Sequence, residues 1–246
     1  MTLDLFSLTY QKMIQSIVVD DFDSFKDYLN IIHSDTEFNK KYQQNFQGAV
    51  QYFSLLIKYK RYQMTEYAVD KEISTINQLL DILKPSLSSN KLSFEYFTKI
   101  LKIKGNINSK PDLEKCSSII ILLLEKPTNY LEEFLSYQKL TQFDSIKLIK
   151  GLDNISQINQ ESFNYLFEFK KNIDNFFIYK INNKSNVALE AFLNFYKSSE
   201  LLKKEQLFNH ISKSTFLNKD VYEKILLNEK LHTHLQEKVK HKTIKI

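Results

Sequence analysis

Glycine and proline, the residues on which most tight turns depend, occur only three times each in this 246-residue chain. A fold rich in β-sheet needs many such turns, because glycine supplies positive φ angles and proline presets the turn. The chain is 43% hydrophobic, which is enough for a real core and rules out a disordered composition. We therefore expect an all-α protein whose helices are joined by polar linkers rich in Asn, Ser and Lys.

Apolar residues recur at helical spacing along nearly the whole chain, and no convincing strand is found. Asp21 or Asp23 can cap the second helix, whose apolar face begins at Phe22, and Pro85 predicts a stop. The first expected helix, 3–19, forms a hairpin with a second helix that begins at residue 22. The others are expected at 40–59, 62–69, 72–84, 92–104, 112–125, 128–138, 143–150, 159–170, 172–180, 186–197, 201–212 and 219–240. Because helices this short are not stable alone, each must bury its apolar stripe on its neighbours.

An internal repeat is the most informative pattern. Helix pairs end in polar exits spaced 31 to 40 residues apart, at Asn39, Asn77, Asn108, Gln142, Asn182 and Asn218. The stretch FTKILKIKGNIN (97–108) resembles the end of an ankyrin repeat, whose period is about 33 residues. VVDDFDSFKDYL (18–29) similarly resembles the junction between inner and outer helix.

This resemblance covers roughly residues 10–218. The Thr-Pro-Leu-His tetrapeptide that begins the inner helix of ankyrin repeats is missing, and Phe, Tyr and Leu replace the alanines that allow close helix packing. It implies a degenerate ankyrin-like helical-repeat solenoid over residues 1–218, followed by a capping helix and basic tail over 219–246. Gly105 would take the left-handed conformation that ends a helix and turns the chain toward the next repeat. Another helical repeat or an irregular all-helical fold is the alternative.

The net charge of +5 is concentrated at the C-terminal end: residues 203–246 hold ten lysines and five acidic residues. Lys238, Lys240 and Lys242 in the tail could meet an acidic protein, nucleic acid or an anionic membrane. A solvated helix end whose lysines complement the helix dipole is the simpler interpretation. Arg61 is the only arginine, which counts against specific reading of bases.

The single cysteine, Cys116, excludes an intramolecular disulfide and is interpreted as a small core residue. The longest apolar run, 119–124, is far too short to span a bilayer, for which about 20 residues are needed. The N-terminus shows no basic region with a cleavage site, so no cleaved signal is expected. We expect a cytoplasmic protein, or one delivered by a signal-independent secretion system.

No candidate for chemistry outweighs a structural explanation. Asp20, Asp21 and Asp23 are interpreted as helix caps, and Glu132 and Glu133 as water-facing residues. His232 and His234 are two residues apart and so lie on different helical faces, which does not suit a metal. The three glycines are too far apart for a phosphate-binding loop. We expect no metal, no cofactor and no enzymatic activity.

Aromatic residues crowd the region around 163–179. Core packing is the first interpretation; a partner-binding surface and base stacking are the others. The candidate partner-binding aromatics are Phe163, Tyr165, Phe167, Phe176 and Tyr179.

The leading hypothesis is a non-catalytic protein–protein interaction module, because stacked repeats present an extended concave surface. Its lysine- and asparagine-rich composition together with the ankyrin-like pattern resembles bacterial or viral proteins that act as effectors or assembly components. A nucleic-acid or anionic-membrane binder using the basic end and an enzyme of an unrecognised helical class are the alternatives.

Overall fold

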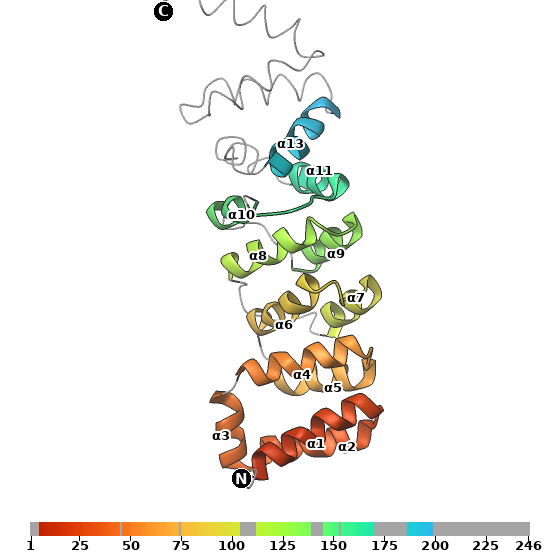
Figure 1. The fold of residues 1–246 in the computed structure, drawn as a ribbon, viewed down its shortest axis with the longest axis vertical. Coiled ribbons are helices and arrows are strands. Elements are labelled where there is room, and N and C mark those ends of the chain that lie inside the picture. Colours follow the sequence, from red (N-terminus) through yellow and green to blue (C-terminus); the bar gives the residue numbers. More distant parts are fainter. Residues whose placement is uncertain are drawn as a thin grey trace, which may run out of the picture. The chain divides into compact units, whose positions relative to one another are not determined.

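The computed structural model describes residues 5–44, 46–73, 75–103, 112–138, 145–152, 154–169 and 186–198. Within these ranges all regular structure is α-helical and no strand occurs, which confirms the all-α prediction (Figure 1). The helices are α1 (Leu5–Val19), α2 (Phe22–Ser34), α3 (Thr36–Gln44), α4 (Phe46–Lys58), α5 (Tyr62–Glu72), α6 (Ile76–Ser88), α7 (Phe94–Ile103), α8 (Leu113–Leu123), α9 (Thr128–Gln138), α10 (Ser145–Leu152), α11 (Gln160–Phe169) and α13 (Asn186–Ser198). No described helix has the length and apolar character needed to cross a membrane.

The chain divides into two compact units. Unit 1 comprises residues 1–122 and 133–140, and unit 2 comprises residues 123–132 and 141–246. The expected boundary at residue 218, the expected helices at 172–180, 201–212 and 219–240, and Gly105 all lie outside the described residues.

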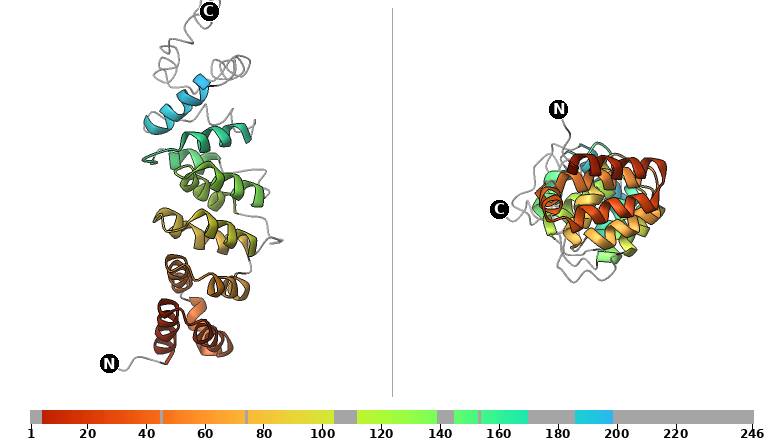
Figure 2. Two further views of the ribbon diagram at one scale, coloured as in Figure 1. Left: turned by 90° about the vertical axis from the view of Figure 1, so that its right-hand side faces the viewer. Right: turned by 90° about the horizontal axis from the view of Figure 1, so that it is seen from below.

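In unit 1, the helix pairs α1/α2, α4/α5 and α6/α7 follow one another in chain order (Figure 2). The first helices contact each other in succession, α1 with α4 and α4 with α6, and the second helices do the same, α2 with α5 and α5 with α7. The middle pair, α4/α5, therefore packs on both the pair before it and the pair after it, which gives its short helices the neighbours they need to bury their apolar stripes.

The same turn closes the first helix of each of these pairs, and none of the three turns uses glycine. Asp20, Lys60 and Asn90 have φ angles of 67°, 55° and 54°, in the left-handed region. The residue after each of them donates a backbone hydrogen bond to the carbonyl five residues back: Asp21 to Ser16, Arg61 to Leu56 and Lys91 to Ser86, at 2.9, 2.9 and 3.1 Å. This is the Schellman arrangement, which satisfies the last carbonyls of a helix.

Core positions keep a constant distance from this turn. Seven residues before the left-handed residue lie Met13, Phe53 and Leu83, and three residues before it lie Ile17, Ile57 and Leu87; all six are buried. The three pairs thus share one turn and one pattern of burial, although their sequences differ.

Two predicted boundaries were wrong. Residues 40–59 do not form one helix, because α3 and α4 are separate elements on either side of residue 45. Pro85 does not end α6, which continues to Ser88. The helix begins at Ile76, directly after Thr75, whose side chain forms a capping box with Gln78 in the first turn. Proline removes one donor from the helix, but continuing past it buries Leu87 in the core.

In unit 2, α11 contacts α13 through a cluster of phenylalanines. The Phe167 ring lies 4.5 Å from Phe163, 5.1 Å from Phe195 and 6.0 Å from Phe192, measured between ring centroids, and all four side chains are buried. The start of α11 is held to the segment that precedes α9, because Asn159 N donates to the Leu124 carbonyl and Ser162 Oγ to the Lys126 carbonyl, both at 2.7 Å.

Candidate interaction surface

The seam between α2 and α5 is built around Tyr67. Its hydroxyl donates to Asn30 Oδ1 at 2.7 Å, and the Phe22 ring meets it edge-on at 6.0 Å. The ammonium groups of Lys26 and Lys71 lie 6.0 and 5.7 Å from the centroid of the Tyr67 ring. Two exposed cations therefore flank one half-buried ring, an arrangement that cation–π attraction favours.

The start of α2 places Phe22 and Lys26 in this seam. Asp21 caps the helix, with its carboxylate accepting from Ser24 N at 3.0 Å. These hydrogen bonds from Ser24 lower the pKa of Asp21, because they favour the charged carboxylate. The prediction that one of the aspartates after α1 caps the next helix is confirmed for Asp21.

The seam between α5 and α7 repeats the combination with Tyr62. Its ring lies 4.6 Å from the Tyr96 ring, and Lys99 Nζ lies 4.1 Å from its centroid. Tyr96 is buried, and its hydroxyl donates to the Leu56 carbonyl at 3.3 Å and is hydrogen-bonded to the Thr65 hydroxyl. Burial raises the pKa of Tyr96, so the phenol stays neutral.

These two seams form what we call the aromatic–lysine surface: Phe22 and Lys26 on α2, Tyr62, Tyr67 and Lys71 on α5, and Lys99 on α7. Exposed carboxylates stand on the same three helices: Asp23, Asp27, Glu66, Asp70 and Glu95. The surface thus offers cations beside aromatic rings, bordered by negative charge. Sequence reasoning did not select it, although Phe22/Lys26 and Tyr67/Lys71 show the spacing of four that places residues on one helical face.

Other polar groups serve structural contacts. Arg61 caps the end of α1: Nε donates to the Ile17 carbonyl and a terminal nitrogen to the Val18 carbonyl, both at 2.8 Å, while the other terminal nitrogen lies 2.9 Å from Asp20. The only arginine of the chain is thus held between the first and second helix pairs.

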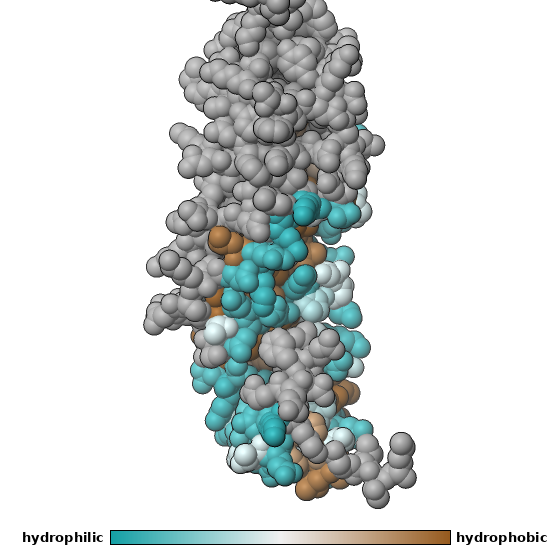
Figure 3. All heavy atoms as spheres, turned by 90° about the vertical axis from the view of Figure 1, so that its left-hand side faces the viewer, coloured by the Kyte–Doolittle hydropathy of each residue, from teal (hydrophilic) through white to brown (hydrophobic). Residues whose placement is uncertain are grey.

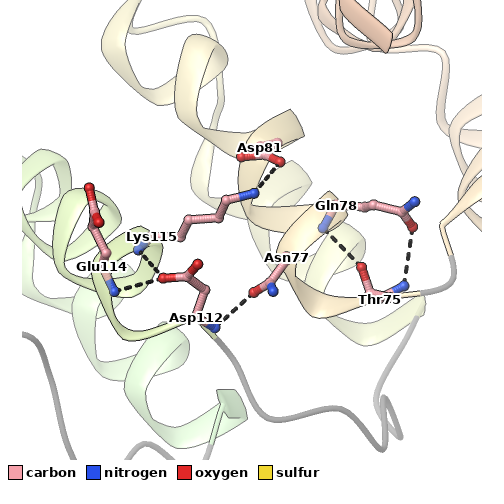
Figure 4. Close-up of polar contacts among 7 residues, drawn as sticks. All are labelled: Thr75, Asn77, Gln78, Asp81, Asp112, Glu114 and Lys115. Atoms are coloured by element: carbon pink, nitrogen blue, oxygen red, sulfur yellow. Dashed lines mark hydrogen bonds and ion pairs between the residues drawn. The ribbon is translucent and has the colours of Figure 1, made fainter. Parts of the chain in front are cut away.

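A second polar junction joins α6 to the start of α8 (Figure 4). Asp112 caps α8 through Glu114 N and Lys115 N, and its own backbone N–H donates to Asn77 Oδ1 at 2.8 Å. Lys115 Nζ reaches Asp81 Oδ2 at 2.5 Å. These contacts satisfy the start of α8 and pair opposite charges, so the cluster holds α8 against α6.

Cys116 is buried, as the core interpretation predicted. Burial, with a smaller contribution from Asp112, raises the pKa of the thiol to about 12, so the reactive thiolate does not form at neutral pH. Within the described residues, no group of three His, Cys, Asp or Glu side chains has the arrangement of a metal site.

The predicted partner-binding aromatics fall into three groups. Phe163 and Phe167 are buried in unit 2, which corrects their assignment to a surface: spaced four apart, they share the helical face that packs on α13. Tyr165 lies on another face of α11 and is half-buried. Phe176, Tyr179, Lys238, Lys240 and Lys242, like His232 and His234, lie outside the described residues.

Comparison of the chain with protein-family models, with curated proteins and with solved structures found no match. The geometry itself is therefore the basis for a functional proposal.

Proposed function

We propose that the chain is a stack of degenerate ankyrin-like helix pairs that acts as a non-catalytic protein-interaction module. In this proposal a protein partner binds over the aromatic–lysine surface of α2, α5 and α7. The observation that carries it is the packing of second helices on second helices, α2 on α5 and α5 on α7, which sets their solvent-facing sides in one row. Extended surfaces of this kind are how repeat proteins bind partners.

The spacing of polar contacts supports the repeat. Asn77 and Asp112 are 35 residues apart, and Asp81 and Lys115 are 34 apart. In unit 2, Gln160 and Asn194 are 34 apart, and Thr128 and Glu161 are 33 apart. These contacts join consecutive helix pairs at separations close to the ankyrin period of about 33 residues, whereas those between the first and second pairs are longer, at 37 for Tyr67 and Asn30 and 39 for His33 and Glu72.

The chemistry of the surface suits a protein partner. Half-buried tyrosines give rigid contact area at little cost in side-chain entropy, and they are enriched among the residues that dominate binding energy. Lys26, Lys71 and Lys99 would pair with carboxylates that lie beside apolar side chains on the partner, and the surrounding acidic residues would restrict the choice of partner.

Photo-crosslinking tests the proposal. Gln63 is exposed on α5 between Tyr62 and Tyr67, so a benzoylphenylalanine at this position should attach to a bound partner in the cells that naturally express the protein. The same probe at Lys84, exposed on α6, is the positional control. We expect an adduct of one defined mass from position 63 and not from position 84.

The double variant Lys26→Glu/Lys71→Glu, checked for helical content by circular dichroism, should lose the adduct. The matched variant Lys84→Glu/Lys91→Glu has the same charge change at exposed positions elsewhere and should keep it. Identical adducts from both probe positions, or an adduct unaffected by the Lys26/Lys71 change, would rule out this surface as the binding site.

A further inference from the structure

The first helix pair exposes apolar side chains at the end of unit 1. Figure 2 shows α1 and α2 facing the viewer in its right-hand view, and Figure 3 shows apolar surface at the lower end of the molecule, where α1 lies. All but one of the well-exposed large apolar side chains in the described residues are on α1 and α2: Leu5 (68% exposed), Leu8 (40%), Val18 (44%), Val19 (63%) and Ile31 (44%).

Four exposed residues along α1 form a stripe with a symmetric order. Leu8, Lys12, Gln15 and Val19 are spaced by four, three and four residues, apolar at both ends and polar in the middle. At 100° per residue they fall within about 60° of the helix circumference, so they lie on one line of its surface. A stripe of this order matches itself when a second α1 runs antiparallel across it.

We propose that this stripe is a docking site for a second copy of the chain, with α1 packed antiparallel on α1 around a twofold axis between Lys12 and Gln15. Leu8 of each copy then meets Val19 of the other, and Lys12 donates to the side-chain oxygen of Gln15. Such a contact is isologous, since each residue pair occurs twice. A partner of unrelated sequence would not require the residues of the stripe to have this symmetric order.

The size and charge of the face predict a weak dimer. A helix of 15 residues is about 22 Å long and about 10 Å wide, so even with part of α2 the contact falls at the small end of protein interfaces. The two Lys12 ammonium groups also approach each other near the axis, and their repulsion opposes association. The polar residues Lys12 and Gln15 at the centre of the stripe nevertheless fix the register of the two helices. The site uses none of the side chains of the aromatic–lysine surface and does not depend on the proposed function.

Sedimentation of the full chain tests the association. Between about 1 and about 200 μM, a concentration range that covers weak dissociation constants, the weight-average mass should rise from monomer toward dimer. Leu8→Glu should weaken dimerisation at least about tenfold, whereas Leu113→Glu, a matched change at a similarly exposed leucine (39%) on α8, should leave it unchanged. Lys12→Gln should strengthen it, because the like charges at the axis are removed.

Disulfide trapping tests the antiparallel register. In a Cys116→Ala background, Leu8→Cys and Val19→Cys proteins are oxidised alone and as a mixture. Only the mixture should form a crosslinked dimer, because two copies of either position lie about 16 Å apart along the helix axis in the antiparallel pair. A monomer at every concentration, equal loss of dimer in Leu113→Glu, or efficient crosslinking of either variant alone would overturn the proposal.

Discussion

The imidazole Nε2 of His33, near the end of α2, lies 2.9 Å from the carboxylate of Glu72 at the end of α5. The Glu72 side chain is only 5% exposed, so water screens this pair far less than it screens a surface ion pair. The contact ties the first helix pair to the second at the end of the helices farthest from their turns.

A double-mutant cycle should detect this coupling. His33→Gln and Glu72→Gln should each destabilise the protein by about 1–3 kcal/mol, because each change removes a hydrogen bond that involves a mostly buried group. In urea unfolding, we expect the double variant to lose at least about 1 kcal/mol less than the sum of the single changes. Strictly additive losses would mean that the two side chains do not stabilise each other.

Arg61→Lys should destabilise the protein by about 1–2 kcal/mol although it keeps the charge. Lysine cannot reproduce the fork that donates to the Ile17 and Val18 carbonyls at the end of α1. Lys84→Arg, at an exposed position on α6, is the control and should stay within about 0.5 kcal/mol of the original. Equal stability of Arg61→Lys and the original chain in urea would show that the carbonyl contacts contribute nothing.

Lys60→Gly should stabilise the protein by about 0.5–1 kcal/mol. A lysine with a φ of 55° bears the steric cost of the left-handed region, and glycine does not. Lys58→Gly, two residues earlier inside the last turn of α4, should instead destabilise by up to about 1 kcal/mol. Thermal unfolding of both variants checks the sign, and a loss of stability in Lys60→Gly would contradict the argument.

Stability should fall as the pH rises above 9. Burial raises the pKa of Cys116 from 9.0 to about 12, and burial together with the charge of Glu72 raises the pKa of Tyr10 from 10.0 to about 12. Well below pH 9 both groups are neutral in the folded and unfolded states and contribute no pH dependence. Above it the unfolded chain loses these protons first, so the free energy of unfolding decreases until the folded groups also ionise near pH 12.

Cys116→Ala should remove the part of this decrease that begins near pH 9. Tyr10→Phe should reduce the part that begins near pH 10, to which the buried Tyr96 also contributes. Urea unfolding measured at intervals from pH 8 to pH 11 provides the test. A stability profile that both substitutions leave unchanged would show that neither group is responsible.

Much of the secondary structure could be read from periodicity alone. The helix expected at 128–138 is α9. The one expected at 159–170 is one residue longer than α11 at each end, and the one expected at 186–197 is one residue shorter than α13 at its C-terminal end. The cap at Asp21 was equally accessible, because an aspartate before a helix accepts hydrogen bonds from neighbouring backbone groups. These features are local, so the residues that produce them stand next to one another in the chain.

The candidate surface was harder to predict. The crowding of aromatic residues around 163–179 suggested Phe163 and Phe167 as candidates, but both are buried by packing. Tyr62 and Tyr67 lie in a helical sequence without such crowding. Their lysine partners include Lys99, 37 positions away from Tyr62 along the chain, and no local pattern shows such a pair.

The sequence by itself determined that the chain is helical and where most of its helices lie, because few turn residues and a 3.6-residue apolar period leave little else to form. Only the tertiary structure decided that α6 continues through Pro85, that Lys60 adopts a left-handed turn and that Arg61 caps carbonyls 43 and 44 residues earlier in the chain. Each of these depends on burial or hydrogen bonding against a neighbouring helix pair. The free energy gained from this burial and hydrogen bonding exceeds the local backbone cost, about 1–3 kcal/mol for a proline inside a helix or a left-handed residue, only once the neighbouring pair is in place.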